Sequence, residues 1–227
     1  PDFQNSYGQG TGGLFEFYDG KGNGLNDNVD ESWGPKLDAG LSVPQWNSPV
    51  VGGIRQATPW VSFPDNVRDF FEYGKTFTNN LAIEGSGDNY SVRVSYTNTS
   101  QTGMVPNTDL KRNSVHINAS ASPYNYLTID FSGNYINSKS ENMPVYGYSG
   151  QNVMQQFMWF GRQVDIQDLK QYRNSDGLLR NWNNYYHNNP YFTLYENLNG
   201  SDRDRLLGQG SANIRITDWL SFKSGLG

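Results

Sequence analysis

The chain has 227 residues, none of them cysteine, with 15% aromatic and only 17% charged residues and a formal net charge of −5. The lack of cysteine excludes disulfides, cysteine-ligated metals and thiol nucleophiles. A mean hydropathy of −0.72, without an apolar run near about 18 residues, excludes helical membrane spans. The aromatic content argues against disorder, and an acidic chain without a basic, aromatic patch indicates no nucleic-acid partner.

The N-terminal third contains few regular elements. Residues 1–4 have neither the basic region nor the apolar core of a signal peptide. Because the chain also stops within an alternating stretch, we expect it to be a segment of a longer protein. Residues 13–18 are a candidate strand, and residues 66–74 read as a short helix that ends at a glycine.

Residues 19–30 have the spacing of a twelve-residue calcium loop. Asp19, Asn23, Asp27 and Asp30 fall at ligand-like positions of that pattern. Lys21, however, stands where an oxygen ligand is required, and no flanking helices are evident. A turn rich in Gly and Asn is therefore the preferred interpretation, and the sequence calls for no metal or other cofactor.

Strict alternation of apolar and polar residues predicts an all-β fold. Successive side chains of a strand point to opposite faces, so residues 89–98 carry Tyr90, Val92, Val94 and Tyr96 on one face and Arg93 on the other. An apolar set that begins and ends in tyrosine is typical of a strand whose outer face crosses a bilayer. Similar patterns predict six strands, at residues 76–84, 89–98, 113–121, 127–138, 206–216 and 220–227.

The connections between these strands alternate strictly in length. Tight turns rich in Gly, Pro, Asp and Ser are expected at 85–88, 122–126 and 217–219, whereas the segments 19–75, 99–112 and 139–205 are long. In an antiparallel up-and-down meander, all the long connections then emerge at one end. Outer-membrane barrels have that asymmetry, so we expect part of a transmembrane β-barrel with long external loops that contain short helices.

The longest loop has its own helical stripe and a cluster of aromatic and amide residues. Residues 152–172 carry apolar residues at near-helical spacing, and flat rings with neighbouring amides suit sugar or peptide recognition. The candidates for contact with substrate or a partner are Trp159, Phe160, Trp182, Tyr185, Tyr186 and Tyr191. The alternative is that most of these rings pack the loop against its neighbours, and this is the preferred interpretation for the group as a whole.

The sequence gives little support to catalysis. His116 and His187 are its only histidines, so a catalytic triad or a histidine-based metal site has little support. Neighbouring carboxylates such as Asp202 and Asp204 say nothing about the separation that glycoside hydrolysis needs. We therefore expect a protein that is not an enzyme and that has no catalytic residues.

Several unusual stretches converge on one family. They are residues 30–38 (DESWGPKLD), 74–80 (GKTFTNN), 105–113 (VPNTDLKRN), 159–165 (WFGRQVD) and 189–197 (NPYFTLYEN). Together they resemble the SusC/RagA-type TonB-linked outer-membrane transporters, and the resemblance runs across nearly the whole chain.

The resemblance implies a barrel of about 22 strands with a plugged lumen in the outer membrane of a Gram-negative bacterium. It also implies energy supplied through the TonB complex, contact with outer-membrane lipid, a SusD-type surface lipoprotein as a lid, and glycan oligomers or peptides as cargo. The plug and the TonB box are not found in these residues. Two alternatives stay open: a soluble β-sandwich that binds carbohydrate or acts as an adhesin, and a passive porin.

Overall fold

The computed structural model describes residues 4–15, 29–183 and 185–227, and this part of the chain is mostly β with few helices. It divides into two compact units. The sheet unit comprises Gly74–Gly103, Thr108–Met143 and Gly200–Gly227, and the loop unit comprises Pro1–Tyr73, Met104–Asn107 and Pro144–Asn199.

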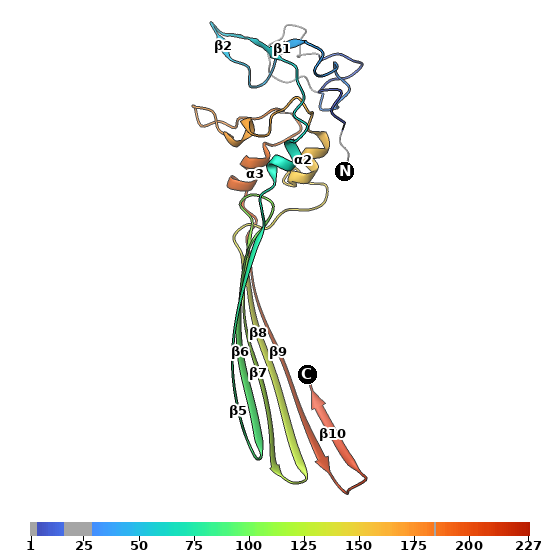
Figure 1. Cartoon of the computed structure of the whole chain (residues 1–227), viewed down its shortest axis with the longest axis vertical. Helices are drawn as coiled ribbons and strands as arrows, with labels where there is room; N and C mark the ends of the chain where they lie inside the picture. Colours follow the sequence, from blue (N-terminus) through green and yellow to red (C-terminus); the bar gives the residue numbers. More distant parts are fainter. Residues whose placement is uncertain (1–3, 16–28, 184) are drawn as a thin grey trace. The chain divides into compact units, whose positions relative to one another are not determined.

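The sheet unit is a six-stranded antiparallel meander (Figure 1). Its strands are β5 (Lys75–Gly87), β6 (Tyr90–Thr102), β7 (Asp109–Tyr124), β8 (Leu127–Ser140), β9 (Ser201–Arg215) and β10 (Ser221–Leu226). Each strand pairs with the next one in the chain, so the order across the sheet is β10-β9-β8-β7-β6-β5. Within the described residues the sheet is open, since β5 and β10 each pair on one side only.

Five of the six strands are longer than the alternation predicted, chiefly at the ends away from the tight turns, whereas β10 is shorter. β6 continues to Thr102, β7 begins at Asp109 and β9 begins at Ser201. The expected loop 99–112 is therefore wrong in extent, since only residues 103–108 separate β6 and β7. The expected loop 19–75 ends at residue 74, and the expected loop 139–205 spans only residues 141–200. Most residues in these strand extensions are polar on both faces, so they show no alternation of apolar and polar residues. Backbone hydrogen bonds nevertheless continue the strand pairing through them.

The register places most of the apolar residues of the six strands on one face. Residues directly opposite each other in a ladder share a face, and Val94 lies opposite both Ile83 and Ile117. Tyr96 lies opposite both Leu81 and Val115 in the same way. Other members of this apolar face are Phe77, Tyr90, Val92, Ala119, Leu127, Ile129, Phe131, Tyr135, Leu206, Ala212, Ile214, Phe222 and Leu226.

Aromatic and amide residues border the apolar face at its two ends. At the tight-turn end, a bulge between Ala121 and Tyr124 brings Tyr124 opposite Leu127, and the Tyr124 ring stacks on Tyr126 with centroids 5.3 Å apart. At the other end the apolar residues give way to a row of amides and a carboxylate. This row consists of Asn79, Asn98, Asn113, Asn137 and Asp204.

The loop unit has a hydrophobic core of its own. Its helices are α1 (Asn66–Phe70), α2 (Val153–Trp159), α3 (Pro190–Glu196) and the 3₁₀ turn η1 (Asp168–Lys170). Two small hairpins accompany them: β1 (Ser42–Pro44) with β4 (Ala57–Pro59), and β2 (Val50–Val51) with β3 (Ile54–Arg55). The core consists of Phe70, Val153, Phe157, Phe160, Val164, Ile166, Leu169, Trp182, Tyr191 and Leu194.

The predicted helices are present in shortened form. The helix expected at 66–74 ends at Phe70, and the stretch 152–172 divides into α2 and η1. The candidate strand at 13–18 is described only to residue 15, where Leu14 forms an isolated bridge with Thr11. No helix in the described residues is long and apolar enough to cross a membrane.

Candidate functional site

Two exposed tyrosines stand on a buried asparagine in the loop unit. The Asn183 side chain is fully buried, and its Oδ1 accepts hydrogen bonds from the backbone N–H groups of Tyr185, at 3.0 Å, and Tyr186, at 2.9 Å. This local turn leaves Tyr185 62% and Tyr186 59% exposed. We call these two residues the tyrosine tip. Asparagine side chains often bond to nearby backbone N–H groups in turns, and Asn183 holds the backbone of the tip in this way.

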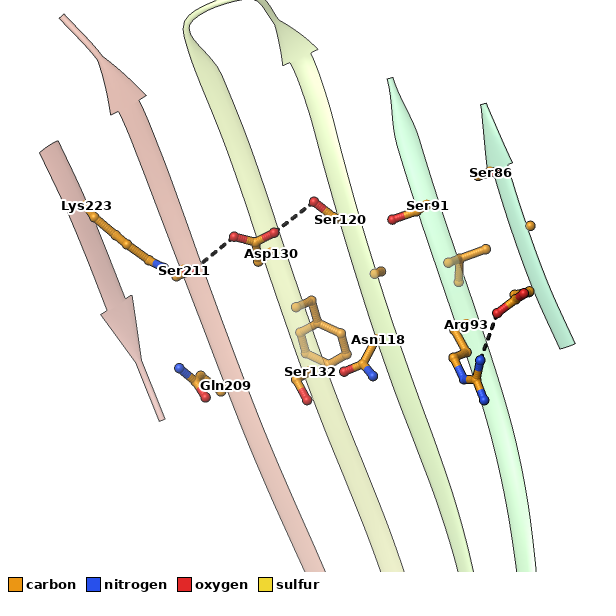
Figure 2. A pocket seen from close by; sticks show the side chains of 15 residues that line it. Ser86, Ser91, Arg93, Asn118, Ser120, Asp130, Ser132, Gln209, Ser211 and Lys223 are labelled. Carbon is orange, nitrogen blue, oxygen red and sulfur yellow. Dashed lines mark hydrogen bonds and ion pairs between the residues drawn. The ribbon is translucent and has the colours of Figure 1, made fainter. Parts of the chain in front are cut away.

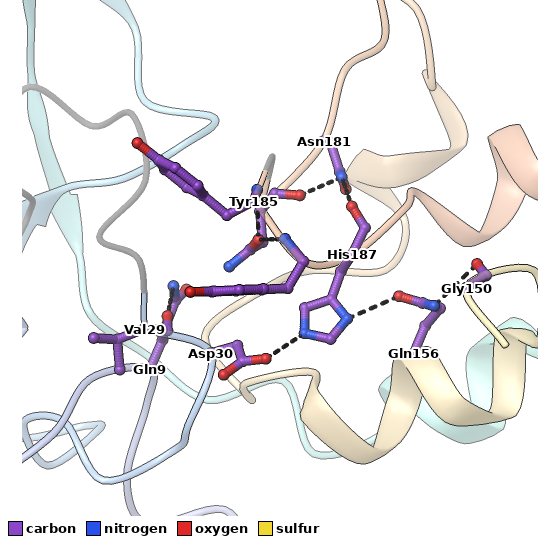
Figure 3. Close-up of polar contacts among 10 residues, drawn as sticks. Gln9, Val29, Asp30, Gly150, Gln156, Asn181, Tyr185 and His187 are labelled. Carbon is purple, nitrogen blue, oxygen red and sulfur yellow. Dashed lines mark hydrogen bonds and ion pairs between the residues drawn. The ribbon is translucent and has the colours of Figure 1, made fainter. Parts of the chain in front are cut away.

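The residue after the tip is the buried His187, which anchors the end of this turn (Figure 3). His187 Nε2 lies 2.6 Å from Asp30 Oδ2, and His187 Nδ1 lies 3.0 Å from Gln156 Oε1. Gln156 Nε2 donates to the Gly150 carbonyl over 3.1 Å, which fixes the amide with its oxygen toward the ring. Both ring nitrogens thus lie within hydrogen-bonding distance of a side-chain oxygen atom.

Aromatic rings cover the same histidine. The His187 ring stacks on Trp182 at a centroid distance of 5.1 Å with an interplanar angle of 9°, and it stacks on Trp159 at 6.2 Å. Only 4% of the His187 side chain is exposed. Asn181 Nδ2 donates to the backbone carbonyls of Asn183 and His187 and closes the turn. The tip therefore rests on a packed and hydrogen-bonded base.

Three of the six candidate contact residues lie in the core. Phe160, Trp182 and Tyr191 are exposed by only 4%, 3% and 4%, so their rings pack the unit and cannot meet a ligand directly. The expectation that they contact cargo is corrected for these three, because all three rings belong to the buried core of the loop unit. Tyr185 and Tyr186 are the exposed members, and Trp159 is half-buried beside His187.

Burial also changes the chemistry of one of these rings. It raises the pKa of the Tyr191 hydroxyl, which is therefore a neutral group at physiological pH. This agrees with a packing role and gives no sign of a reactive phenolate.

The calcium-loop residues are mostly outside the described part of the chain. Asp19, Asn23 and Asp27 lie in residues 16–28, which the structure does not describe. Asp30 is described, and its Oδ2 accepts the His187 hydrogen bond. Among residues 4–15, 29–183 and 185–227, no group of three or more His, Asp or Glu side chains has the geometry to hold a metal ion.

The polar face of the sheet unit contains a second candidate region (Figure 2). It is a hollow of about 690 Å³ lined mainly by hydroxyl, amide and charged side chains. Arg93 Nη1 donates to Glu84 Oε2 over 2.8 Å, and Asp130 Oδ1 accepts from Ser120 Oγ over 2.8 Å. Lys223 reaches toward the same region in Figure 2. The hollow is wide and polar, which suits contact with water or with another polar surface.

The hydrogen-bond network around His187 was not predicted from the sequence. His187 and Asp30 are 157 positions apart, and no local pattern joins them. The helix α3 was also missed, although a signal exists. Asn189 followed by Pro190 is a typical helix start, and Asn189 Oδ1 accepts from the N–H groups of Tyr191 and Phe192.

No model of a known protein family matches the chain, and no curated protein matches it.

Proposed function

We propose that this chain is part of the transmembrane β-barrel of a SusC/RagA-type TonB-linked transporter in the outer membrane of a Gram-negative bacterium. The protein binds glycan oligomers or peptides between its external loops and a SusD-type lipoprotein lid. It releases them inward by gated passage that TonB energises, and it carries out no covalent chemistry.

The observation that carries the proposal is the continuous apolar face of the sheet unit. Every strand contributes to it in register, and most of its large side chains have no protein neighbour over them, as for Ile83, Phe131 and Leu206. An apolar area of this size in contact with water would be unfavourable. Lipid chains would cover it, and the bordering tyrosines match the aromatic girdles of membrane barrels.

The height of the apolar face agrees with a bilayer. From Leu127 to Tyr135 on β8, eight residue steps at about 3.3 Å each give about 26 Å along the strand. Tilted by about 40°, this corresponds to a height of about 20 Å, which fits within an apolar band about 25 Å tall. Beyond Tyr135 the outward residues are Asn137 and, on β9, Asp204, which suit the polar side of the interface.

The opposite face agrees with a wet or plugged interior. It carries the Arg93–Glu84 ion pair, Asp130 and a series of serines on neighbouring strands. The connections support the same arrangement in part, since the short turns at 88–89, 125–126 and 216–220 all leave one end of the strands. The long segment 141–200 leaves the other end, together with the six-residue connection 103–108, and this end would be the external one.

The tyrosine tip is the part of the loop unit that we propose for contact with cargo or lid, and Trp159 together with residues 152–169 would form the docking element. Tyr185→Ala combined with Tyr186→Ala should reduce uptake and lid association in the complete protein. Tyr146→Ala removes an exposed ring elsewhere in the same unit and is the matched control. Unchanged uptake in the double variant would rule out the tip as a contact.

Extraction tests the barrel itself. The complete protein should stay with the membrane fraction in high salt and enter solution only with detergent. A protein that stays in aqueous buffer without detergent would instead be the soluble β-sandwich module. Uptake should also stop when TonB is deleted, whereas uptake that continues without TonB would identify a passive porin.

A further inference from the structure

Three arginines of the sheet unit gather around one serine on the polar face. Arg112 of β7 lies directly opposite Ser138 of β8, and Ser138 lies directly opposite Arg203 of β9. Arg205 follows two residues later on β9 and therefore points to the same face. The three arginines, with Ile136 and Ser138, line a small cavity of about 90 Å³, and Arg112 Nε donates to Ser138 Oγ over 3.3 Å.

Strand β9 carries its acidic residues on one face of the sheet and its arginines on the other. The order Asp202, Arg203, Asp204, Arg205 alternates acid and base, so a strand sends both aspartates to one face and both arginines to the other. On the aspartate face, Asn137 Nδ2 donates to Asp202 Oδ1 and Asp204 Oδ1, both at 3.0 Å. The two acids are thus engaged on the side of the sheet away from the arginines.

No carboxylate of the six strands neutralises the arginines on their own face. The carboxylates on that face are Glu84, which pairs with Arg93, and Asp130. Asp130 is six residues from Ile136 along β8, which is about 20 Å and beyond a screening length of about 8 Å at physiological salt. Across all the described residues, the ion pairs of the chain include none of the three arginines.

Arg112 lies on β7, and Arg203 and Arg205 lie on β9, so these arginines stand on the two strands that flank β8. Their like charges repel one another, and an anion held between them would relieve that repulsion. Arginine is the residue best suited to hold an anion, because its planar guanidinium group offers five N–H donors in a fork that matches two oxygens of a carboxylate or phosphate. Ser138 adds a hydroxyl in the middle of the cluster. The cavity of about 90 Å³ also exceeds the roughly 30 Å³ that one water occupies in the liquid, which leaves room for a small oxyanion.

We propose that Arg112, Arg203 and Arg205 form a binding site for a single oxyanion group, a carboxylate, phosphate or sulfate. The site stands on the register and charge of the sheet alone and does not require the barrel. The anion comes either from a dissolved molecule, such as an acidic cargo, or from a carboxylate side chain elsewhere in the complete protein.

The thermal stability of the complete purified protein tests the site and distinguishes the two sources. The probe is inorganic phosphate, compared with chloride at equal ionic strength. The variants are Arg203→Gln, Arg205→Gln and the double change, together with Arg203→Lys, which keeps the charge but loses the fork. Lys223→Gln removes a cation from the same face outside the cluster and is the matched control.

A dissolved oxyanion predicts that phosphate raises the Tm of the wild type and of Lys223→Gln by a few degrees. The rise should be smaller in Arg203→Lys and absent in the double variant. An internal carboxylate predicts no phosphate effect and a lower Tm in each Arg→Gln variant. The proposal is overturned if phosphate acts equally on all variants, or if it has no effect and the Arg→Gln variants are as stable as the wild type or more so.

Discussion

In the loop unit Phe157 and Val164 are exposed by 4% and 0%, whereas in the sheet unit Ile83 and Leu206 are exposed by 71% and 78%. Both units have well-defined hydrogen bonding, so the contrast concerns where the apolar side chains go. The loop unit folds its rings against one another around α2 and α3. The sheet unit arranges comparable residues on one face and leaves them without a protein layer.

The two units therefore depend on different surroundings for their stability. A unit with a packed core carries its own source of stability in water. A single amphipathic sheet needs another layer or a membrane, because each domain buries its apolar face against something. Changes in the core should therefore affect the loop unit alone, and changes on the apolar face should affect the sheet through what covers it.

The largest effect is expected from a cavity in the loop core. Phe157→Ala removes a buried ring that lies 4.8 Å from the Phe70 ring and 5.6 Å from the Phe160 ring, and it should cost about 3–5 kcal/mol. Limited proteolysis should then cleave the loop unit while β5–β9 stay protected. Met158→Ala on the same helix, at an exposed position, should leave the pattern unchanged. Equal protection in both variants would contradict an independent core.

A charge on the apolar face should have the next largest effect. Val94→Arg brings a cation to the middle of that face and should cost about 2–4 kcal/mol if the face meets the centre of a bilayer. The change is measured as the free energy of unfolding of the complete protein in lipid vesicles. Ser95→Arg is the same substitution on the next residue, which faces His116 on the polar face, and it should cost much less. Equal costs would rule out lipid contact.

Loss of the histidine anchor should have a local effect in the loop unit. Asp30→Asn removes the charge of the His187 partner and should cost about 1.5–3 kcal/mol, the range for hydrogen bonds to charged groups. Hydrogen exchange at the Tyr185 and Tyr186 amides should accelerate, since the base of the tip loosens. Glu31→Gln changes an exposed neighbour and serves as the control. Unchanged exchange in Asp30→Asn would show that the tip is held without His187.

The faces of the sheet could be predicted from the sequence because the side-chain period of a strand is local. Val92 and Val94 fall on one face whatever the register, and the observed register joins them to Ala119 and Ile117. The strand ends could not be predicted. Residues such as Thr99 and Ser100 are polar on both faces, and their pairing depends on backbone groups that every residue has.

The site was less predictable because its members meet through distant parts of the chain. Trp182 and Tyr185 are close in sequence and equally aromatic, yet one is buried and the other exposed. The difference arises from Asn183, whose buried amide turns the chain between them, and from Asp30, which meets His187 across 157 positions. Composition identified the cluster, but only packing separates its base from its exposed tip.

The smallest effect is expected at the surface of the loop unit. Asp38 is an exposed residue at φ 59°, a left-handed conformation that aspartate tolerates better than most residues. The Ser62 hydroxyl donates to its Oδ2 over 2.6 Å and the Ser62 N–H to its Oδ1 over 3.1 Å. These bonds, the hydroxyl first, hold the pKa of Asp38 below its usual value of 3.8.

Because the folded pKa of Asp38 is lowered, its contribution to stability is complete above the ordinary value and disappears as the pH falls through the folded value. Ser62→Ala should therefore raise the pKa of Asp38 and weaken the acid dependence of unfolding below about pH 4. An NMR titration of the Asp38 carboxyl group measures the first change, and acid unfolding of the loop unit measures the second. Asp38→Asn should remove the same part of the acid dependence, and adding Ser62→Ala to it should change nothing further. An Asp38 carboxyl that titrates identically with and without the Ser62 hydroxyl would contradict the assignment.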